Sequence, residues 1–132
     1  MAKFYYFDTS ALLSAALKQG PFKEISKILA SESEILSSAL IESETLATFK
    51  RENLESKIAL PWLERISIVF TERSLTRELM QVFESGYCRG ADAHHIATAL
   101  YLDPEAKDLI FVTLDDNQKK VANAAGFKCW SL

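Results

Sequence analysis

The opening stretch, residues 3–13, constrains the fold more than any other part of the chain. Its four consecutive aromatic residues, Phe4 to Phe7, form a short unbroken apolar run that is typical of a strand buried on both faces of a parallel sheet. Asp8 follows at the carboxyl end of this strand, which is where ligands bind in open α/β sheets. We expect Thr9 or Ser10 to cap a helix that comes next. Asp8 is therefore either a site residue facing a crevice or simply a turn residue or helix cap.

The rest of the chain alternates helix-like and strand-like segments, which indicates stacked βαβ units in one domain over residues 1–132. After the first strand, further strands are predicted at 34–38, 66–70, 109–113 and 127–132. Helices are predicted at 11–17, 22–30, 39–54, 74–85, 90–102 and 118–125. Pro61 is expected to start one more short helical turn.

Composition argues against several classes of protein. The net charge of -3 and the pI near 5.4 are not those of a protein that coats nucleic acid with a broad basic surface. They still permit an enzyme that grips a few phosphates around a bound metal. No apolar run approaches the roughly 18 residues of a membrane span, so we expect a cytoplasmic protein with no membrane partner. Cys88 and Cys129 fit no metal or redox spacing and are expected to be reduced packing residues.

Acidic residues recur where a crevice is expected. Asp8 and the pair Asp115 and Asp116 each follow a buried strand, and Glu44 and Asp92 fall in early turns of predicted helices. Four carboxylates are therefore able to meet, although acidic residues are also common on any surface. Carboxylates brought together repel one another unless they hold a hard divalent cation such as Mg²⁺ or Mn²⁺. Such an ion activates water and stabilises charge on a phosphodiester, so the pattern favours metal-dependent hydrolysis.

Four motifs taken together resemble those of PIN-domain nucleases and, within these, the VapC-type toxin ribonucleases. They are Phe-Asp-Thr-Ser-Ala-Leu-Leu at 7–13, Ser-Ser-Ala-Leu-Ile-Glu-Ser-Glu at 37–44, Gly-Ala-Asp-Ala-His-His-Ile-Ala-Thr-Ala at 90–99 and Val-Thr-Leu-Asp-Asp at 112–116. The resemblance places the four metal-binding and catalytic acids of the family on Asp8, Glu44, Asp92 and Asp115, with hydroxyl groups near the metal on Ser10 and Thr113. It implies a three-layer α/β/α fold with a central parallel sheet and a ribonuclease dependent on Mg²⁺ or Mn²⁺. It also implies an RNA substrate, a homodimer and control by a small antitoxin protein.

Two of the four positions offer a second acid. Glu42 and Glu44 are two residues apart in a predicted helix, so their side chains point to nearly opposite sides and only one can reach the site. Geometry and resemblance together favour Glu44. At the other position the resemblance favours Asp115, while Asp116 precedes Asn117 and is expected to cap the last helix.

Other functions remain open at this stage. One alternative is a catalytically silent PIN-like module that only binds a partner. The other is a phosphoryl-transfer domain that uses Asp8 as nucleophile. The second hypothesis is weakened because Ser10 replaces the second acid of an Asp-x-Asp motif. His95, one helical turn after Asp92, either contacts substrate or makes a structural hydrogen bond. The basic residues that either contact RNA phosphates or lie on a solvated surface are Arg51, Arg73, Arg77, Arg89, Lys119 and Lys120.

Overall fold

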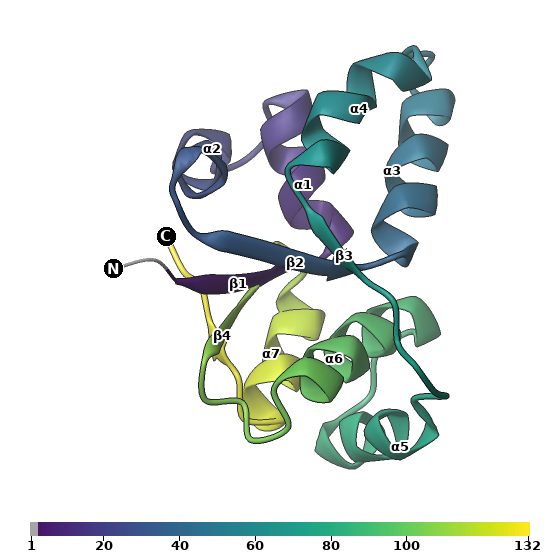
Figure 1. Ribbon diagram of the computed structural model, residues 1–132, viewed down its shortest axis with the longest axis vertical. Coiled ribbons are helices and arrows are strands. Elements are labelled where there is room, and N and C mark those ends of the chain that lie inside the picture. The colour runs from purple at the N-terminus through teal and green to yellow at the C-terminus, as the bar shows by residue number, and fades with distance from the viewer. Residues whose placement is uncertain (1–2) are drawn as a thin grey trace.

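A five-stranded parallel sheet forms the centre of the molecule (Figure 1). The structure is a computed structural model that describes residues 3–132, so residues 1 and 2 of the predicted domain lie outside it. The strands are β1 (Phe4–Phe7), β2 (Glu34–Ser38), β3 (Ser67–Val69), β4 (Leu109–Val112) and β5 (Lys128–Cys129). Their order across the sheet is β3-β2-β1-β4-β5, and every pair of neighbours is parallel. The first strand of the chain is thus its central strand.

Helices cover both faces of this sheet. They are α1 (Thr9–Leu17), α2 (Phe22–Ala30), α3 (Leu40–Arg51), α4 (Ser56–Glu64), α5 (Thr76–Ser85), α6 (Gly90–Leu102) and α7 (Asp116–Ala124). The first four lie on one side of the sheet and the last three on the other, as Figure 1 shows. This arrangement confirms the predicted three-layer α/β/α fold.

The alternation of side chains along the strands builds two hydrophobic cores. Tyr5 and Phe7 point into the core shared with α1 and α2, whereas Tyr6 points into the core shared with α5, α6 and α7. Ile110 and Val112 of β4 join the first core in the same way. Full burial of one large apolar side chain stabilises a fold by about 1.5 to 3 kcal/mol. The aromatic run therefore anchors the sheet to both helical layers at once.

The strand-to-helix turn after β1 differs in detail from the prediction. Asp8, rather than Thr9 or Ser10, is the N-cap of α1, with an extended backbone at φ -82° and ψ 176°. Its side chain accepts a hydrogen bond from the amide of Ala11 at 3.0 Å. Thr9 and Ser10 are already helical, because an aspartate caps a helix as well as a serine and stands one residue earlier. The cap orients the Asp8 carboxyl toward the start of the helix.

The prediction that Pro61 starts a helical turn is wrong, because α4 begins at Ser56 and contains Pro61. Ala59 is fully buried, and Trp62 and Leu63 pack against the first core at the i, i+3 and i+4 spacing of a helix. Pro61 lies on the exposed side. Water can there replace the backbone hydrogen bond that proline cannot donate.

The two outer strands are shorter than predicted. β3 has three residues instead of the five in the segment 66–70, and β5 has two instead of the six in 127–132. Both lie at edges of the sheet, where only one neighbour supports them. Within residues 3–132, no helix is long and apolar enough to span a bilayer.

Candidate active site

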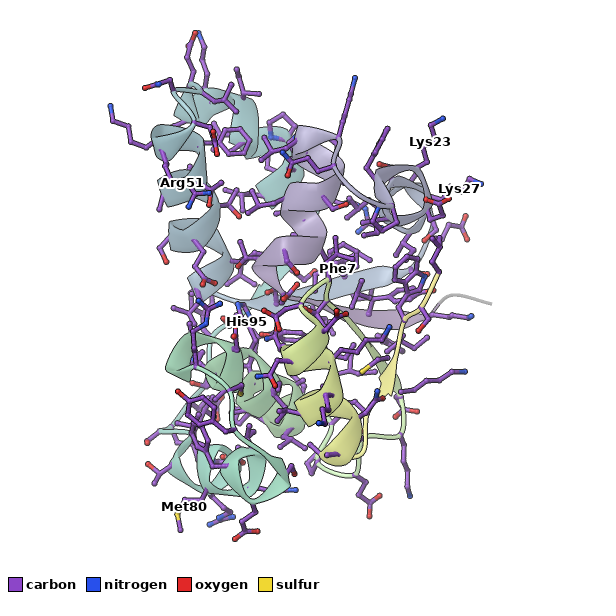
Figure 2. All side chains as sticks on the ribbon, turned by 180° about the vertical axis from the view of Figure 1, so that it is seen from behind. Phe7, Lys23, Lys27, Arg51, Met80 and His95 are labelled. Carbon is purple, nitrogen blue, oxygen red and sulfur yellow. The ribbon has the colours of Figure 1, made fainter. Side chains whose placement is uncertain are left out.

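A cavity of about 320 Å³ opens at the carboxyl ends of β1 and β4. Its lining residues are Asp8, Thr9, Ser10, Leu13, Glu44, Thr48, Arg51, Arg89, Asp92, His95 and Asp115. All four acids that the resemblance selected are among them. Figure 2 shows Arg51 on α3 and His95 on α6 at one side of the molecule, far from Lys23 and Lys27 on α2. We call this space the acid cavity.

Asp8 is the most deeply buried of the four acids, with 4% of its surface exposed. One carboxyl oxygen, Oδ1, accepts hydrogen bonds from Ser10 Oγ at 2.7 Å and from the Ala11 amide. The other, Oδ2, accepts from Thr113 Oγ1 at 2.6 Å. Burial nevertheless raises the pKa of Asp8 above its ordinary value, because desolvation outweighs these hydrogen bonds. A nearby positive charge would favour its ionised form.

Glu44 is held by residues from two other elements, α1 and α6. Its Oε1 accepts hydrogen bonds from Thr9 Oγ1 at 2.6 Å and from His95 Nε2 at 3.0 Å. The hydrogen bond from His95 is the main reason why the pKa of Glu44 is lowered. The carboxylate is therefore ionised and its position is set from two sides.

Behind Glu44, the buried His95 ring continues a chain of hydrogen bonds to the central strand. His95 Nδ1 lies 2.9 Å from the hydroxyl of Tyr6, which is fully buried and accepts from the Ser38 amide at 3.1 Å. Since a carboxylate only accepts, we assign the imidazole proton to Nε2, with Nδ1 accepting from Tyr6. His95 thus makes the structural hydrogen bond considered from sequence, and its partner is a site acid. His95 is also among the residues that line the acid cavity.

Asp92 and Asp115 complete the wall of the acid cavity. Asp92 lies in the first turn of α6 and makes a loose ion pair through Oδ2 with Arg89 Nε at 3.4 Å. Asp115 is the N-cap of α7, and its Oδ1 accepts from the Gln118 amide at 2.8 Å. The prediction that Asp116 caps this helix is therefore wrong: Asp116 is already the first helical residue and its side chain is exposed.

Gln118 was not singled out from the sequence, yet it connects three elements beneath the cavity. It is fully buried. Its Oε1 lies 2.9 Å from Thr113 Oγ1, and its Nε2 donates to the backbone carbonyl of Asp92 at 3.1 Å. Asp115, three residues before Gln118, has the spacing of a helix-capping pair, which is the one sequence signal that marks this position.

Some of the remaining predicted residues line or adjoin the acid cavity, and others lie away from it. Ser10 lines the cavity and Thr113 lies directly behind Asp8, whereas Glu42 is exposed and absent from the lining. Among the six basic residues considered, the cavity contains Arg51 and Arg89. Arg73 is instead bonded through both terminal nitrogens to Glu78, at 2.9 and 2.6 Å.

The donor chemistry of the acid cavity suits a hard divalent cation. No three His, Cys, Asp or Glu side chains in the described part of the chain stand close enough to share an ion, so the four acids surround a space rather than form a tight cluster. Mg²⁺ commonly keeps several waters and takes only one or two carboxylates. The hydrogen bonds described above use Glu44 Oε1 and Asp115 Oδ1 and leave the second oxygen of each carboxylate for such a hydrated ion.

Comparison with known families assigns the fold that carries this site. The sequence matches the PIN domain over residues 5–124, which is most of the chain. The protein belongs to the PIN-domain family, whose fold is generally that of a metal-dependent nuclease. No curated protein matches the chain.

Proposed function

We propose that this protein is a metal-dependent endoribonuclease of the toxin type, which hydrolyses phosphodiester bonds in RNA. The observation that carries the proposal is the meeting of Asp8, Glu44, Asp92 and Asp115 around one cavity at the carboxyl edge of a PIN-domain sheet. Each comes from a different part of the chain, so their convergence is not that of one polar helix face.

In this proposal the four acids surround a hydrated Mg²⁺ or Mn²⁺, which one or two of them bind directly. The ion, when bound, supplies an activated water and neutralises charge on the phosphodiester. Arg51 and Arg89, which line the same cavity, neutralise the phosphate of the RNA strand. Ser10 and Thr113 act on Asp8, whose carboxyl they hold by donating hydrogen bonds.

His95 and Thr9 are positioning residues for Glu44, since both donate to its Oε1. Neither of these hydrogen bonds uses Oε2. The proton on His95 Nε2 is kept there by the acceptor role of Nδ1 toward Tyr6.

Two other functions fit the site less well. An Asp8 nucleophile needs an accessible carboxylate, but both Asp8 oxygens are occupied by hydrogen bonds and the residue is buried. A silent partner-binding module has no use for four carboxylates around a cavity, because their mutual repulsion destabilises the fold without a ligand. The toxin assignment rests on the resemblance of the motifs, and it brings with it a homodimer and a small antitoxin partner.

RNA cleavage by the purified chain tests the proposal. We expect cleavage with Mg²⁺ or Mn²⁺, none with EDTA, and losses of orders of magnitude for Asp8→Asn, Asp92→Asn and Glu44→Gln. Glu42→Gln is the matched control, because it removes the same charge from the same helix on its exposed side. Undiminished cleavage by a folded Asp8→Asn protein would overturn the mechanism.

Binding measured without catalysis provides a second readout. Calorimetric titration with Mn²⁺ should give heat for the unmodified chain and little for Asp8→Asn. The toxin assignment is tested by expressing the chain with and without the product of a neighbouring short gene. Growth arrest that this product relieves is the expected result, and growth without arrest by an active nuclease would count against a toxin.

A further inference from the structure

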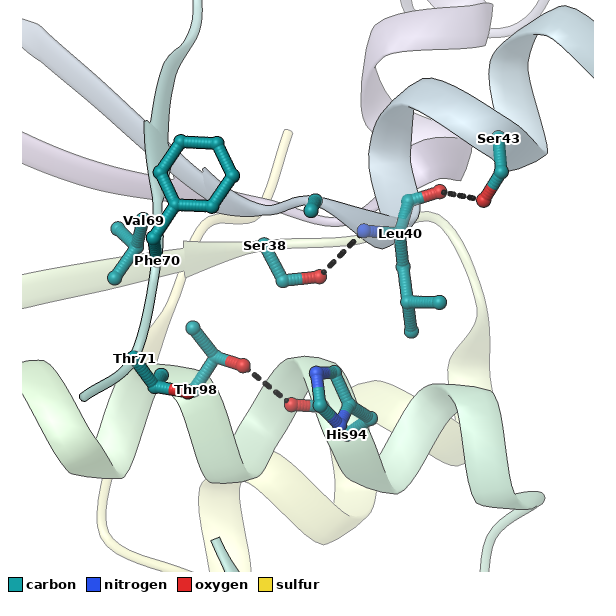
Figure 3. A pocket seen from close by; sticks show the side chains of 9 residues that line it. Ser38, Leu40, Ser43, Val69, Phe70, Thr71, His94 and Thr98 are labelled. Atoms are coloured by element: carbon teal, nitrogen blue, oxygen red, sulfur yellow. Dashed lines mark hydrogen bonds between the residues drawn. The ribbon is translucent and has the colours of Figure 1, made fainter. Parts of the chain in front are cut away.

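A second cavity, of about 480 Å³, lies beside the acid cavity on the β3 side of the sheet. Its lining residues are Ser38, Ala39, Leu40, Ser43, Val69, Phe70, Thr71, His94 and Thr98. Figure 3 shows Phe70 beyond the end of β3 and His94 on α6, at opposite sides of the opening. We call this space the Phe70 pocket. Its volume is in the range of pockets that bind small organic groups.

The chemistry of the Phe70 pocket differs from that of the acid cavity. No Asp, Glu, Lys or Arg is among its nine lining residues, and His94 is their one ionisable imidazole. The acid cavity, in contrast, contains four carboxylates and two guanidinium groups. A charged phosphate or a metal ion therefore fits the acid cavity, while the Phe70 pocket fits an uncharged group with polar edges.

Neighbouring residues of α3 and α6 line the two cavities. Ser43 of the Phe70 pocket precedes Glu44 of the acid cavity on α3, and His94 precedes His95 on α6. Successive side chains on a helix are turned by about 100°, so the two cavities lie on adjacent sides of the same two helices. A strand whose phosphate lies in the acid cavity can therefore extend along these helices toward the Phe70 pocket.

Phe70 offers an aromatic face to such a base. Its side chain is 75% exposed, and the residue directly follows β3. Ile66, just before β3, and Ile68, within it, pack against the first core. An exposed aromatic ring next to a strand that is anchored in the core is available for stacking, the interaction by which proteins hold unpaired bases. Ser43 Oγ donates to the Leu40 carbonyl at 3.1 Å and so keeps its lone pairs for accepting from a base edge.

We infer that the Phe70 pocket is a subsite for one unpaired nucleobase of the RNA strand, stacked on Phe70 and next to the phosphate held in the acid cavity. The inference rests on the proposed ribonuclease function and adds to it a determinant of substrate choice. It requires single-stranded RNA at the cleavage site, because a base inside a duplex cannot enter the pocket.

Binding of short single-stranded RNA tests this subsite. The parent protein is Asp8→Asn, which keeps the strand uncut, and affinity is measured by fluorescence anisotropy. Adding Phe70→Ala should weaken binding about 10-fold, the loss expected from one stacked base. Adding Phe70→Tyr should restore it. Phe83→Ala is the matched control, since it removes a half-exposed ring from α5, outside both cavities.

RNA copies that each carry one abasic nucleotide locate the base. At one position the abasic copy should bind the parent about 10-fold less tightly, and there Phe70→Ala should cause no further loss. Equal binding by the Phe70→Ala and Phe83→Ala proteins, or an undiminished effect of Phe70→Ala on every abasic copy, would overturn the subsite. Cleavage by the unmodified chain with Mg²⁺ is measured separately, so that its absence counts against the ribonuclease and not against the pocket.

Discussion

Asp115 has two roles that substitutions can separate. Its Oδ1 caps α7 through the Gln118 amide, and its carboxylate also lines the acid cavity. Asparagine caps a helix about as well as aspartate, so Asp115→Asn should keep the cap and remove the charge, whereas Asp115→Ala removes both. Asp116→Ala is the neighbouring control, because that side chain is exposed and makes no cap.

The size of the expected effect follows from the cap. Loss of an N-cap side chain costs about 1 kcal/mol, within a range of roughly 0.5 to 2. For a chain of 132 residues this corresponds to a fall in melting temperature of roughly 3 to 5 °C. We expect this difference between Asp115→Ala and Asp115→Asn, measured without metal so that ligand binding does not contribute. Asp116→Ala should stay within about 0.5 kcal/mol of the unmodified chain.

Cleavage assays on the same proteins complete the test. Both Asp115 variants should lose activity by orders of magnitude, while Asp116→Ala should keep most of it. Equal melting of Asp115→Ala and Asp115→Asn, together with a loss of several degrees in Asp116→Ala, would show that the cap is assigned to the wrong residue. Full activity of Asp115→Asn would remove Asp115 from the proposed metal site.

Four further predictions follow from the buried groups. Burial raises the pKa of Asp8, so as the pH rises from 3.8 the folded chain binds more protons than the unfolded one and loses stability. Metal-free Asp8→Asn should therefore be more stable than the unmodified chain toward neutral pH. Urea titrations that show no such gain would contradict this. Hydrogen bonds from Arg73 lower the pKa of Glu78 to about 2, so Glu78→Gln should be destabilising at neutral pH, and thermal melts should show this effect fading as the pH falls from about 4.5 to about 2. Tyr6→Phe leaves the Ser38 amide and His95 Nδ1 without their buried partner and should lower the free energy of unfolding by about 1 to 3 kcal/mol. His95→Gln should retain more cleavage than His95→Ala, because an amide can still donate a hydrogen bond to Glu44.

The fold was largely predictable because its signals are local. The runs Phe4–Phe7 and Leu109–Val112 are too apolar for strands with one solvent-exposed face, which indicates a parallel sheet. Parallel strands place their carboxyl ends at the same edge of the sheet. The apolar stripe of α6 has a clear helical period. These two features were enough to bring Asp8, Asp92 and Asp115 to one place.

Sequence-based prediction failed where the structure depends on a single hydrogen bond or on contacts between residues far apart in the chain. Asp115 and Asp116 have the same chemistry, and only the backbone of the turn decides which of them caps α7. The contact between Tyr6 and His95 joins residues 89 positions apart, so no local pattern reveals it. The spacing of the four acids likewise depends on how α3 and α6 sit on the sheet, and the sequence suggested a tighter group than the structure forms.

The short outer strands affect how the molecule behaves at high concentration. Exposed sheet edges can recruit the strand of another copy and so start aggregation. β3 with three residues and β5 with two present so few free backbone groups that an added strand would gain only one or two hydrogen bonds. The sheet edges therefore do little to drive polymerisation, even though the sheet has five parallel strands. Any self-association of this chain is accordingly expected to use its helices, where side chains rather than backbone determine which partner is accepted.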